Sequence, residues 1–236
     1  MRLSAGQLAR MIDHTLLKAE TTPAQIEALC AEAIEYGFKA VCVNPIHVRR
    51  AAALISEAAR GATGAVIPVV ASVAGFPLGA STAETKADEA RRALDDGAVE
   101  IDMVADIGAL IAGERRTVRK DIEAVARVVH GRRPQGILKV ILETATLTEE
   151  QTILGCRCCA EGEADFVKTS TGFHASGGAT LESVRRLHRH ASPILVKAAG
   201  GIRSAAHALA FAEAGASRIG TSSAVTIMRE MRDSGS

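Results

Sequence analysis

The sequence predicts an α/β fold, a single (β/α)8 TIM barrel that spans residues 1–236 as one domain. Short apolar runs alternate with amphipathic stretches along the whole chain, which is typical of βαβ units around a parallel sheet. Eight such units in 236 residues fit a closed barrel better than an open, doubly wound sheet. The open dinucleotide-binding sheet also requires a G-x-G-x-x-G turn after its first strand, and that turn is missing.

Eight apolar runs are predicted as strands, six from a clear pattern and the first and last from their place in the repeat. They cover residues 11–16, 39–43, 67–73, 99–104, 137–143, 165–169, 194–198 and 217–221. Strand and helix signals alternate throughout, so each strand is expected to be joined to the next by a helix.

Helix signals lie between the predicted strands. Thr22 supplies an N-cap, Pro23 stands in the first turn, and Gly37 is the C-terminal stop of the helix between them. The remaining helices are predicted over residues 45–61, 81–98, 115–130, 148–162, 180–190, 204–215 and 224–231.

Composition favours a small molecule as the partner. The chain is 47% hydrophobic and 23% charged with a formal net charge of +1, which gives no electrostatic footprint for nucleic acid or for an anionic membrane. No stretch approaches the roughly 18 uninterrupted apolar residues of a membrane span, and the first residues lack the apolar segment of a secretory signal.

Cysteine usage indicates a reducing, cytoplasmic setting. The chain has five cysteines, an odd number without the spacing of a disulfide framework. The CRCC run at 156–159 suggests a metal site, but its helical spacing and the lack of a second Cys/His cluster argue against one.

Polar side chains gather at the ends of the predicted strands, where barrel enzymes place their chemistry. Side chains alternate along a strand, so Glu100 shares a face with Asp102, and Phe166 shares one with Lys168. Neighbouring parallel strands lie about 4.8 Å apart, and Lys197 is on the strand after Lys168. If these faces point inward, two lysines and an aspartate converge.

This convergence predicts Schiff-base chemistry. A free lysine has a pKa of about 10.4, so only about one molecule in 2,500 is the neutral amine at pH 7. Burial and a like charge both disfavour the ammonium, and a pKa lowered by about three units, or about 4 kcal/mol, makes the amine available. Lys168 is the expected nucleophile, Lys197 the expected tuner of its pKa and Asp102 the expected proton shuttle.

Three turns built of small residues predict a phosphate site. They are STGF at 170–173, AAGG at 198–201 and GTSSA at 220–224, and Arg203 follows the second of them. Phosphate sites in barrels frequently use the loops after strands 7 and 8 together with a helix N-terminus. A phosphorylated substrate is therefore expected.

Several of these residues have a second interpretation. The alternative to a role for Lys197 in tuning the pKa of Lys168 is a role as a phosphate ligand or as a structural ion-pair partner. Glu100, Lys139 and Glu143 share inward parity on neighbouring strands, which favours a structural ion-pair network over direct chemistry. Cys42 is interpreted as a small pocket-lining residue and not as a nucleophile.

Over nearly its whole length the sequence resembles the deoxyribose-phosphate aldolase family. The matching stretches are IDHTLL (12–17), VCVNP (41–45), VAGFPLG (73–79), EIDMV (100–104), LKVILET (138–144), DFVKTSTGF (165–173), VKAAGGIR (196–203) and GASRIGTSS (215–223). The resemblance implies a class I aldolase, a carbon–carbon lyase that reversibly cleaves 2-deoxy-D-ribose 5-phosphate to acetaldehyde and D-glyceraldehyde 3-phosphate in deoxyribonucleotide catabolism. It implies no metal or organic cofactor, and a homodimer, with a homotetramer as the alternative.

The resemblance also implies roles for individual residues. The Schiff base falls on Lys168 in VKTSTG, its activation on Lys197 in VKAAGG, and the proton relay on Asp102 in EIDMV. The implied substrate-binding residues are Asp13, Thr15, Cys42 and Thr169, and the implied phosphate-binding residues are Gly172, Gly200, Gly201, Arg203, Gly220, Ser222 and Ser223.

Two departures from the family pattern stand out. Some members place a tyrosine at the extreme C-terminus that reaches the pocket, whereas this sequence ends in IMREMRDSGS, so water and Asp102 must suffice or turnover is slower. Phe173 follows Gly172 where some relatives have lysine, which shifts phosphate binding towards backbone amides and Arg203. Two functional alternatives stay open: another lysine-dependent phosphosugar aldolase, and a non-catalytic phosphosugar-binding barrel.

Overall fold

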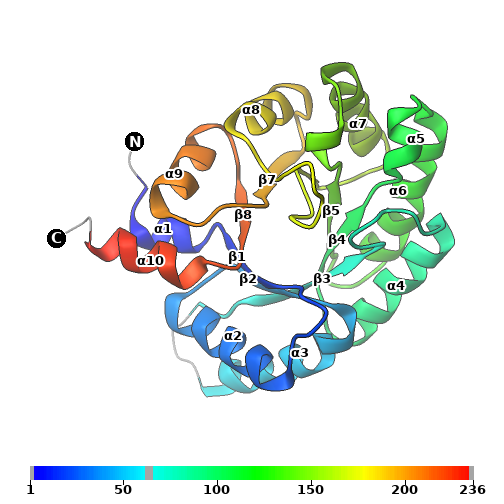
Figure 1. Cartoon of the computed structure of the whole chain (residues 1–236). Helices are drawn as coiled ribbons and strands as arrows, with labels where there is room; N and C mark the ends of the chain where they lie inside the picture. Colours follow the sequence, from blue (N-terminus) through cyan, green and yellow to red (C-terminus); the bar gives the residue numbers. More distant parts are fainter. Residues whose placement is uncertain (1–2, 62–65, 234–236) are drawn as a thin grey trace.

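The computed structural model describes residues 3–61 and 66–233, and it confirms the predicted barrel. Eight parallel strands follow one another around the ring, and the last pairs with the first. Helices surround the strands on the outside (Figure 1). The strands are β1 (Ile12–Leu16), β2 (Ala40–Val43), β3 (Val69–Ala74), β4 (Glu100–Val104), β5 (Ile137–Ile141), β6 (Phe166–Lys168), β7 (Leu195–Ala199) and β8 (Arg218–Thr221).

The predicted strands and helices are confirmed to within a few residues, and two short helices, α1 and α5, are additional. The helices are α1 (Ala5–Ala9), α2 (Pro23–Tyr36), α3 (Val48–Gly61), α4 (Ala83–Asp95), α5 (Ile107–Ile111), α6 (Arg115–His130), α7 (Glu149–Glu161), α8 (Leu181–His190), α9 (Ala205–Glu213) and α10 (Ala224–Asp233), with 3-10 turns η1 (Pro45–His47) and η2 (Thr144–Thr146). The ends of the predicted domain, residues 1–2 and 234–236, lie outside the described residues. In the part of the chain that is described, every helix is too short or too polar to cross a bilayer.

The helix ends follow the capping signals in the sequence. At the start of α2, the Thr22 hydroxyl accepts a hydrogen bond from the Gln25 N–H, and the Gln25 side chain accepts one from the Thr22 N–H. Pro23 occupies the first turn, where no intrahelical N–H bond is lost. Gly37 ends the helix in the left-handed region, with φ of 65°, which glycine adopts at little cost.

The barrel interior has an apolar half and a charged half. β2 and β3 contribute Ala40, Cys42, Ala71 and Val73, which form a small buried cluster. The inward positions of β4 to β8 and of β1 instead include most of the buried charged side chains, which are described with the site. Strand register sets their level, because parallel pairing holds inward residues of neighbouring strands side by side.

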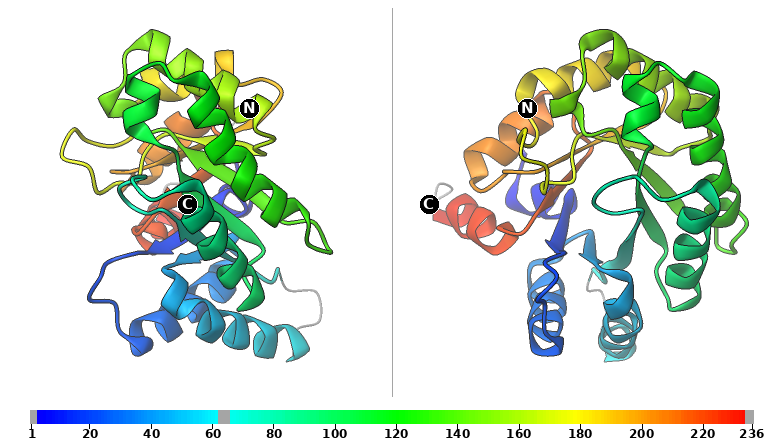
Figure 2. Two further views of the ribbon diagram at one scale, coloured as in Figure 1. Left: turned by 90° about the vertical axis from the view of Figure 1, so that its right-hand side faces the viewer. Right: turned by 45° about the vertical axis from the view of Figure 1, so that its right-hand side comes forward.

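The connections that follow the strands project from one face of the barrel. Figure 2 shows the β1–α2 connection in dark blue and the β6–α8 connection in yellow leaving the same side of the ring. This is the C-terminal face, where the sequence places its polar strand ends and small-residue turns.

One glycine fixes the β3–α4 connection against the end of β4. Gly79 has φ of 70°, and a Cβ atom there would lie 2.2 Å from the carbonyl oxygen of Ala105. Its N–H donates to the Gly75 carbonyl at 2.7 Å, which closes the turn. The position therefore needs glycine for both its backbone conformation and its lack of a side chain.

Gly79→Ala is expected to destabilise the fold more than Gly113→Ala. Gly113 has a similar φ of 76°, but a Cβ atom there would meet nothing within 4 Å. The control variant, Gly113→Ala, should lose about 1 kcal/mol of its free energy of unfolding from backbone strain. Gly79→Ala should lose a further 1–3 kcal/mol, roughly, from the clash. The two melting temperatures, followed by circular dichroism, should differ by at least about 3 °C. Equal melting temperatures would contradict the close approach.

Candidate functional site

The predicted convergence of two lysines and an aspartate is confirmed. Asp102 on β4 accepts hydrogen bonds from Lys168 on β6 and Lys197 on β7, and both Nζ atoms lie 2.7 Å from the same oxygen, Oδ2. Lys168 is 3% exposed, and the other two side chains are fully enclosed. Lys168 and Lys197 are Cα partners on paired strands, so their side chains enter the barrel at one level.

Four more buried charged side chains extend this group inside the barrel. Lys139 donates to the second Asp102 oxygen at 2.8 Å and lies 2.7 Å from Glu100. Arg218 donates to Asp13 at 2.6 Å and to Glu100 at 3.0 Å, and Lys197 also donates to Asp13. We call these seven side chains the lysine–carboxylate cluster: Asp13, Glu100, Asp102, Lys139, Lys168, Lys197 and Arg218.

The ion pairs of the cluster can be compared with those predicted from the sequence. The predicted structural pair between Glu100 and Lys139 is confirmed. Lys197 also takes part in buried ion pairs, with Asp13 and Asp102, so its alternative interpretation as an ion-pair partner is confirmed as well. Tuning and ion pairing are compatible, because a lysine held charged by two carboxylates is a fixed positive charge for its neighbours.

Glu143 was expected in this network, and that prediction is wrong. β5 ends at Ile141, and Glu143 adopts the left-handed conformation with φ of 57°, so the alternation of inward and outward positions is lost before it. Its carboxylate accepts hydrogen bonds from the N–H and the hydroxyl of Thr171. Glu143 thus holds the turn that follows β6 and forms no ion pair with the cluster.

Charge balance makes Lys168 the easiest member of the cluster to neutralise. Four cations face three carboxylates, so the cluster has one uncompensated positive charge when every group is ionised. Burial disfavours such a charge. Burial and the charge of Lys197 lower the pKa of Lys168, although Asp102 opposes them.

The neighbours of Lys168 keep their charges. Burial lowers the pKa of Lys197, but Asp102 and Asp13 outweigh burial and the net shift is upward. Lys139 behaves in the same way through Asp102 and Glu100, so its pKa is also raised. For Asp102, burial is outweighed by the three lysines, which hold its pKa well below the usual range. Among the three lysines, the lowered pKa is therefore confined to Lys168.

A cavity of about 340 Å³ opens on the C-terminal face, and Lys168 is the single cluster member that lines it. Its walls come from the connections after β1, β6, β7 and β8. Of the predicted site residues, those that line it are Thr15, Lys168, Gly172, Gly200, Gly201, Arg203, Gly220 and Ser222. Within the lysine–carboxylate cluster, the lysine of lowered pKa is thus the lysine that a bound molecule can reach.

The small-residue turns shape the wall of the cavity. Gly172, Gly200 and Gly201 all have positive φ, between 81° and 95°. A Cβ atom on Gly200 would lie 2.9 Å from the Cα atom of Gly178, so the two connections touch through bare backbone. Such turns leave backbone N–H groups free of side-chain cover, as anion sites require.

Four predicted binding residues lie outside the lining of the cavity. Asp13 belongs to the cluster, and Cys42 is fully buried in the apolar half of the barrel. The Thr169 hydroxyl exchanges two hydrogen bonds of 3.0 Å with the backbone of Ala199 and so joins β6 to β7. Ser223 directly precedes the last helix, with its N–H donating to the Thr221 hydroxyl. For Thr169 the structure thus shows a link to the β7 backbone, and the predicted contact with substrate stays a prediction.

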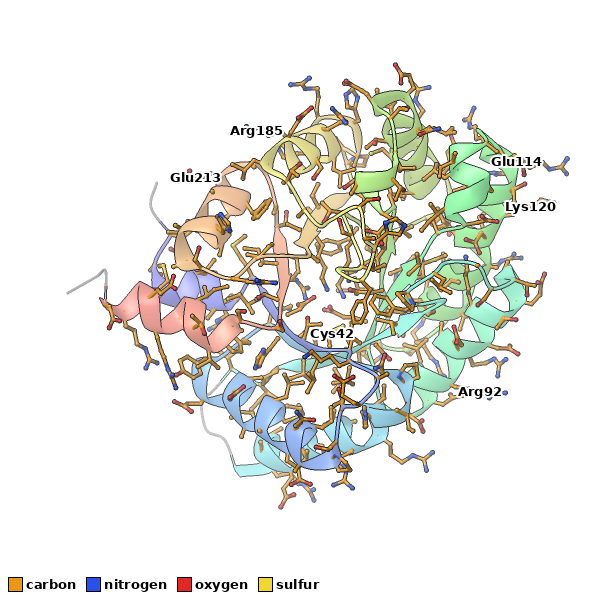
Figure 3. The ribbon with its side chains drawn as sticks, viewed as in Figure 1. Cys42, Arg92, Glu114, Lys120, Arg185 and Glu213 are labelled. Carbon is orange, nitrogen blue, oxygen red and sulfur yellow. The ribbon has the colours of Figure 1, made fainter. Side chains whose placement is uncertain are left out.

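Cys42 lies near the centre of the ring, whereas the labelled Arg92, Glu114, Lys120, Arg185 and Glu213 lie on its outer rim (Figure 3). Burial, with Asp102 adding to it, raises the pKa of the Cys42 thiol to about 11 against the opposing lysines. The thiol is therefore protonated at neutral pH. The three cysteines of CRCC pack into the core, and no group of three or more His, Cys, Asp or Glu residues in the described ranges is arranged to hold a metal.

Three features of the site are not indicated by the sequence analysis. Arg218 lies in the stretch GASRIGTSS and is given no role there, although an arginine inside a buried strand is itself a signal of an ion pair. Lys18 lines the cavity directly after the stretch IDHTLL. Phe173 meets Phe76 of the β3–α4 connection edge to face, with ring centroids 5.2 Å apart, which no periodic pattern indicates.

The fold and the cavity define a class of protein: a (β/α)8 barrel with a reachable lysine of lowered pKa beneath a rim of small-residue turns. Comparison with known proteins narrows this class. The family model described as DeoC/LacD family aldolase matches residues 8–228. The chain belongs to that family.

Individual relatives cover almost the whole chain. A deoxyribose-phosphate aldolase of Thermococcus gammatolerans is 52% identical over 227 residues, which is 96% of this chain and 97% of the relative. One of Carboxydothermus hydrogenoformans is 49% identical over 228 residues, 96% of each chain. A solved tetrameric deoxyribose phosphate aldolase of Aeropyrum pernix superposes with a TM-score of 0.88 at 33% identity, covering 98% of this chain and 94% of its own.

The five thiols are expected to be unreactive in the native protein at pH 8. Burial raises the pKa of Cys30 and Cys42 to about 11 and that of Cys156 to about 12, so roughly one Cys42 thiol in 1,000 is ionised. Titration with a thiol-reactive disulfide dye should release little colour from the native protein and five equivalents after denaturation in guanidinium. Rapid labelling of Cys42 in the native protein would contradict its burial.

Proposed function

We propose that this protein is a deoxyribose-phosphate aldolase that acts through a Schiff base on Lys168. It reversibly cleaves 2-deoxy-D-ribose 5-phosphate to acetaldehyde and D-glyceraldehyde 3-phosphate. The observation that carries the proposal is the lysine–carboxylate cluster, in which the one member that lines the cavity is also the lysine of lowered pKa. Family membership and the names of the relatives support the choice of substrate.

Reaction begins when the neutral Nζ of Lys168 attacks C1 of the open-chain sugar. The carbonyl oxygen takes up a proton and leaves as water, and an iminium joins Nζ to C1. Asp102 orients the amine through the 2.7 Å hydrogen bond to Nζ. The new positive charge of the iminium replaces the ammonium charge beside Asp102, so the carboxylate stabilises the intermediate as well.

Cleavage follows from the electron demand of the iminium. The C3 hydroxyl loses its proton, the electrons of the C2–C3 bond move towards nitrogen, and glyceraldehyde 3-phosphate departs from an enamine. C2 then takes a proton, and water hydrolyses the iminium to release acetaldehyde and restore the amine. The charges of Lys139, Lys168 and Lys197 hold the pKa of Asp102 so low that the carboxylate alone is a weak base. We therefore assign the proton relay to the Lys197–Asp102 pair together with water, and not to Asp102 by itself.

The phosphate group would bind at the rim, in the turns after β6, β7 and β8. Gly172, Gly200, Gly201 and Gly220 supply backbone that a phosphate can approach, and Ser222 precedes the N-terminus of α10. Arg203 lines the same wall and supplies positive charge. This arrangement supports a substrate pose with the phosphate at the mouth and the aldehyde at Lys168.

We also propose a cytoplasmic homodimer, with a homotetramer as the alternative. A relative from Aeropyrum pernix is described as tetrameric, and the cysteine usage supports a reducing compartment. Light scattering on the purified protein separates a mass of two chains from one of four.

A retro-aldol assay tests the function directly. Incubation with 2-deoxy-D-ribose 5-phosphate should yield glyceraldehyde 3-phosphate, detected by a coupled dehydrogenase, and Lys168→Met should lower kcat/KM by at least roughly 10³-fold. Borohydride reduction with acetaldehyde should attach an ethyl group to Lys168, identified by peptide mass spectrometry. An adduct found only on other lysines would overturn the assignment. Cleavage of a different phosphosugar alone would favour the alternative aldolase, and no cleavage at all would favour the binding barrel.

Lys197→Met should move the acid limb of the pH–rate profile to higher pH. Removing the ammonium removes a like charge that lowers the pKa of Lys168, so this pKa rises and the neutral amine appears later on titration. The expected shift is roughly one unit or more, since a unit charge at short range in a protein is worth more than about 1.4 kcal/mol.

Lys139→Met is the matched control for this shift. Lys139 is equally buried and binds Asp102, but through the oxygen opposite the one that holds Lys168. Its removal should move the acid limb in the same direction and by less. Equal shifts, or an unchanged profile for Lys197→Met, would contradict a specific tuning role for Lys197.

A further inference from the structure

The charge available to a phosphate group at the cavity mouth is unevenly spread. Phe173, on the β6–α8 connection, contributes an aromatic ring, so that side of the mouth has no cation at this position. Arg203 lines the β7–α9 side. Lys18 lines the cavity from the β1–α2 connection and is exposed to solvent.

Lys18 and Arg203 share a property that the deeper cations lack. The ammonium and guanidinium have no hydrogen-bond or ion-pair partner within residues 3–61 and 66–233, whereas Lys139, Lys197 and Arg218 are each held by carboxylates. Two cations that line the same cavity are therefore uncommitted in the folded protein. Both can turn to an anionic ligand without breaking an existing contact.

The closed barrel places these two cations on either side of one turn. β8 pairs with β7 on one side and with β1 on the other. The connections that hold Arg203 and Lys18 thus flank the turn of Ser222 and the start of α10. The backbone of Lys18 is fixed there, because its carbonyl accepts hydrogen bonds from the N–H and the hydroxyl of Thr21.

We propose that Lys18 is a specificity-determining residue: with Arg203, it brackets the substrate phosphate and selects phosphorylated over unphosphorylated deoxyribose. This inference rests on the proposed function and adds to it a residue outside the small-residue turns. A phosphate dianion between two cations is matched in charge, and the lysine can follow the ligand on its flexible stem. Lys18 lies at the rim, away from the reacting carbon, so it acts on substrate binding and leaves the bond-breaking step unchanged.

Steady-state kinetics on two substrates test the proposal. Lys18→Met should lower kcat/KM for 2-deoxy-D-ribose 5-phosphate about tenfold, mainly through KM, and leave kcat/KM for 2-deoxy-D-ribose within about twofold. Inorganic phosphate should inhibit the variant about tenfold more weakly than the wild type. Lys120→Met removes the same charge from the outer helix ring and should change none of these values.

A compensating substitution gives a second, independent measurement. Phe173 lines the same cavity from the first of the three small-residue turns, so Phe173→Lys in the Lys18→Met background should recover most of the lost preference for the phosphorylated sugar. Failure to recover, together with an equal loss on both sugars, would show that Lys18 shapes the fold or the chemistry.

The outcomes separate this inference from the proposed function. If Lys18→Met matches Lys120→Met while the wild type cleaves the phosphorylated sugar, the role of Lys18 is overturned and the aldolase stands. If the wild type cleaves neither sugar, the proposed function is overturned, and inhibition by inorganic phosphate can no longer be measured. In that case, equal binding of inorganic phosphate to wild type and Lys18→Met in calorimetry would overturn the site too.

Discussion

One buried carboxylate holds the centre of this barrel together. Asp102 accepts hydrogen bonds from Lys139, Lys168 and Lys197, which arrive from three different strands. Without it, Lys168 would lose its ion-pair partner in a water-poor interior, and Lys139 and Lys197 would keep only Glu100 and Asp13, respectively, at a cost of several kcal/mol. The same contact that stabilises the closed ring therefore also fixes the position of Lys168, the one member of the lysine–carboxylate cluster that reaches the cavity.

The interior is divided so that the neutral amine is favoured. Small apolar side chains from β2 and β3, such as Cys42 and Val73, exclude water on one side. The charged strands on the other side bring one cation more than they bring carboxylates. Desolvation and a net positive charge act in the same direction on the pKa of Lys168, so the role proposed for it as a nucleophile requires no dedicated base beside it.

Most of the fold, and the centre of the site, could be predicted from the sequence because both depend on strict periodicity. Alternating apolar and amphipathic runs define the barrel, and the two-residue period of strands places Asp102, Lys168 and Lys197 on inward positions. The position of Glu143 could not be predicted in this way, because β5 ends before it and its own left-handed conformation breaks the alternation. The place of Lys18 in the cavity wall could not be predicted either, because a connection between strand and helix has no period. Only the closed topology brings Lys18 beside the turns after β7 and β8.

The edge-to-face contact of Phe76 with Phe173 links the connections that leave the ring at β3 and at β6, and Phe173 also lines the cavity. The cavity lies towards β7, β8 and β1, where the turns proposed to bind phosphate lie. In the substrate pose proposed above, the phosphate lies at the rim and the carbonyl carbon at Lys168. In that pose the three-carbon product lies between the opening and the two-carbon product, so the three-carbon product must leave first.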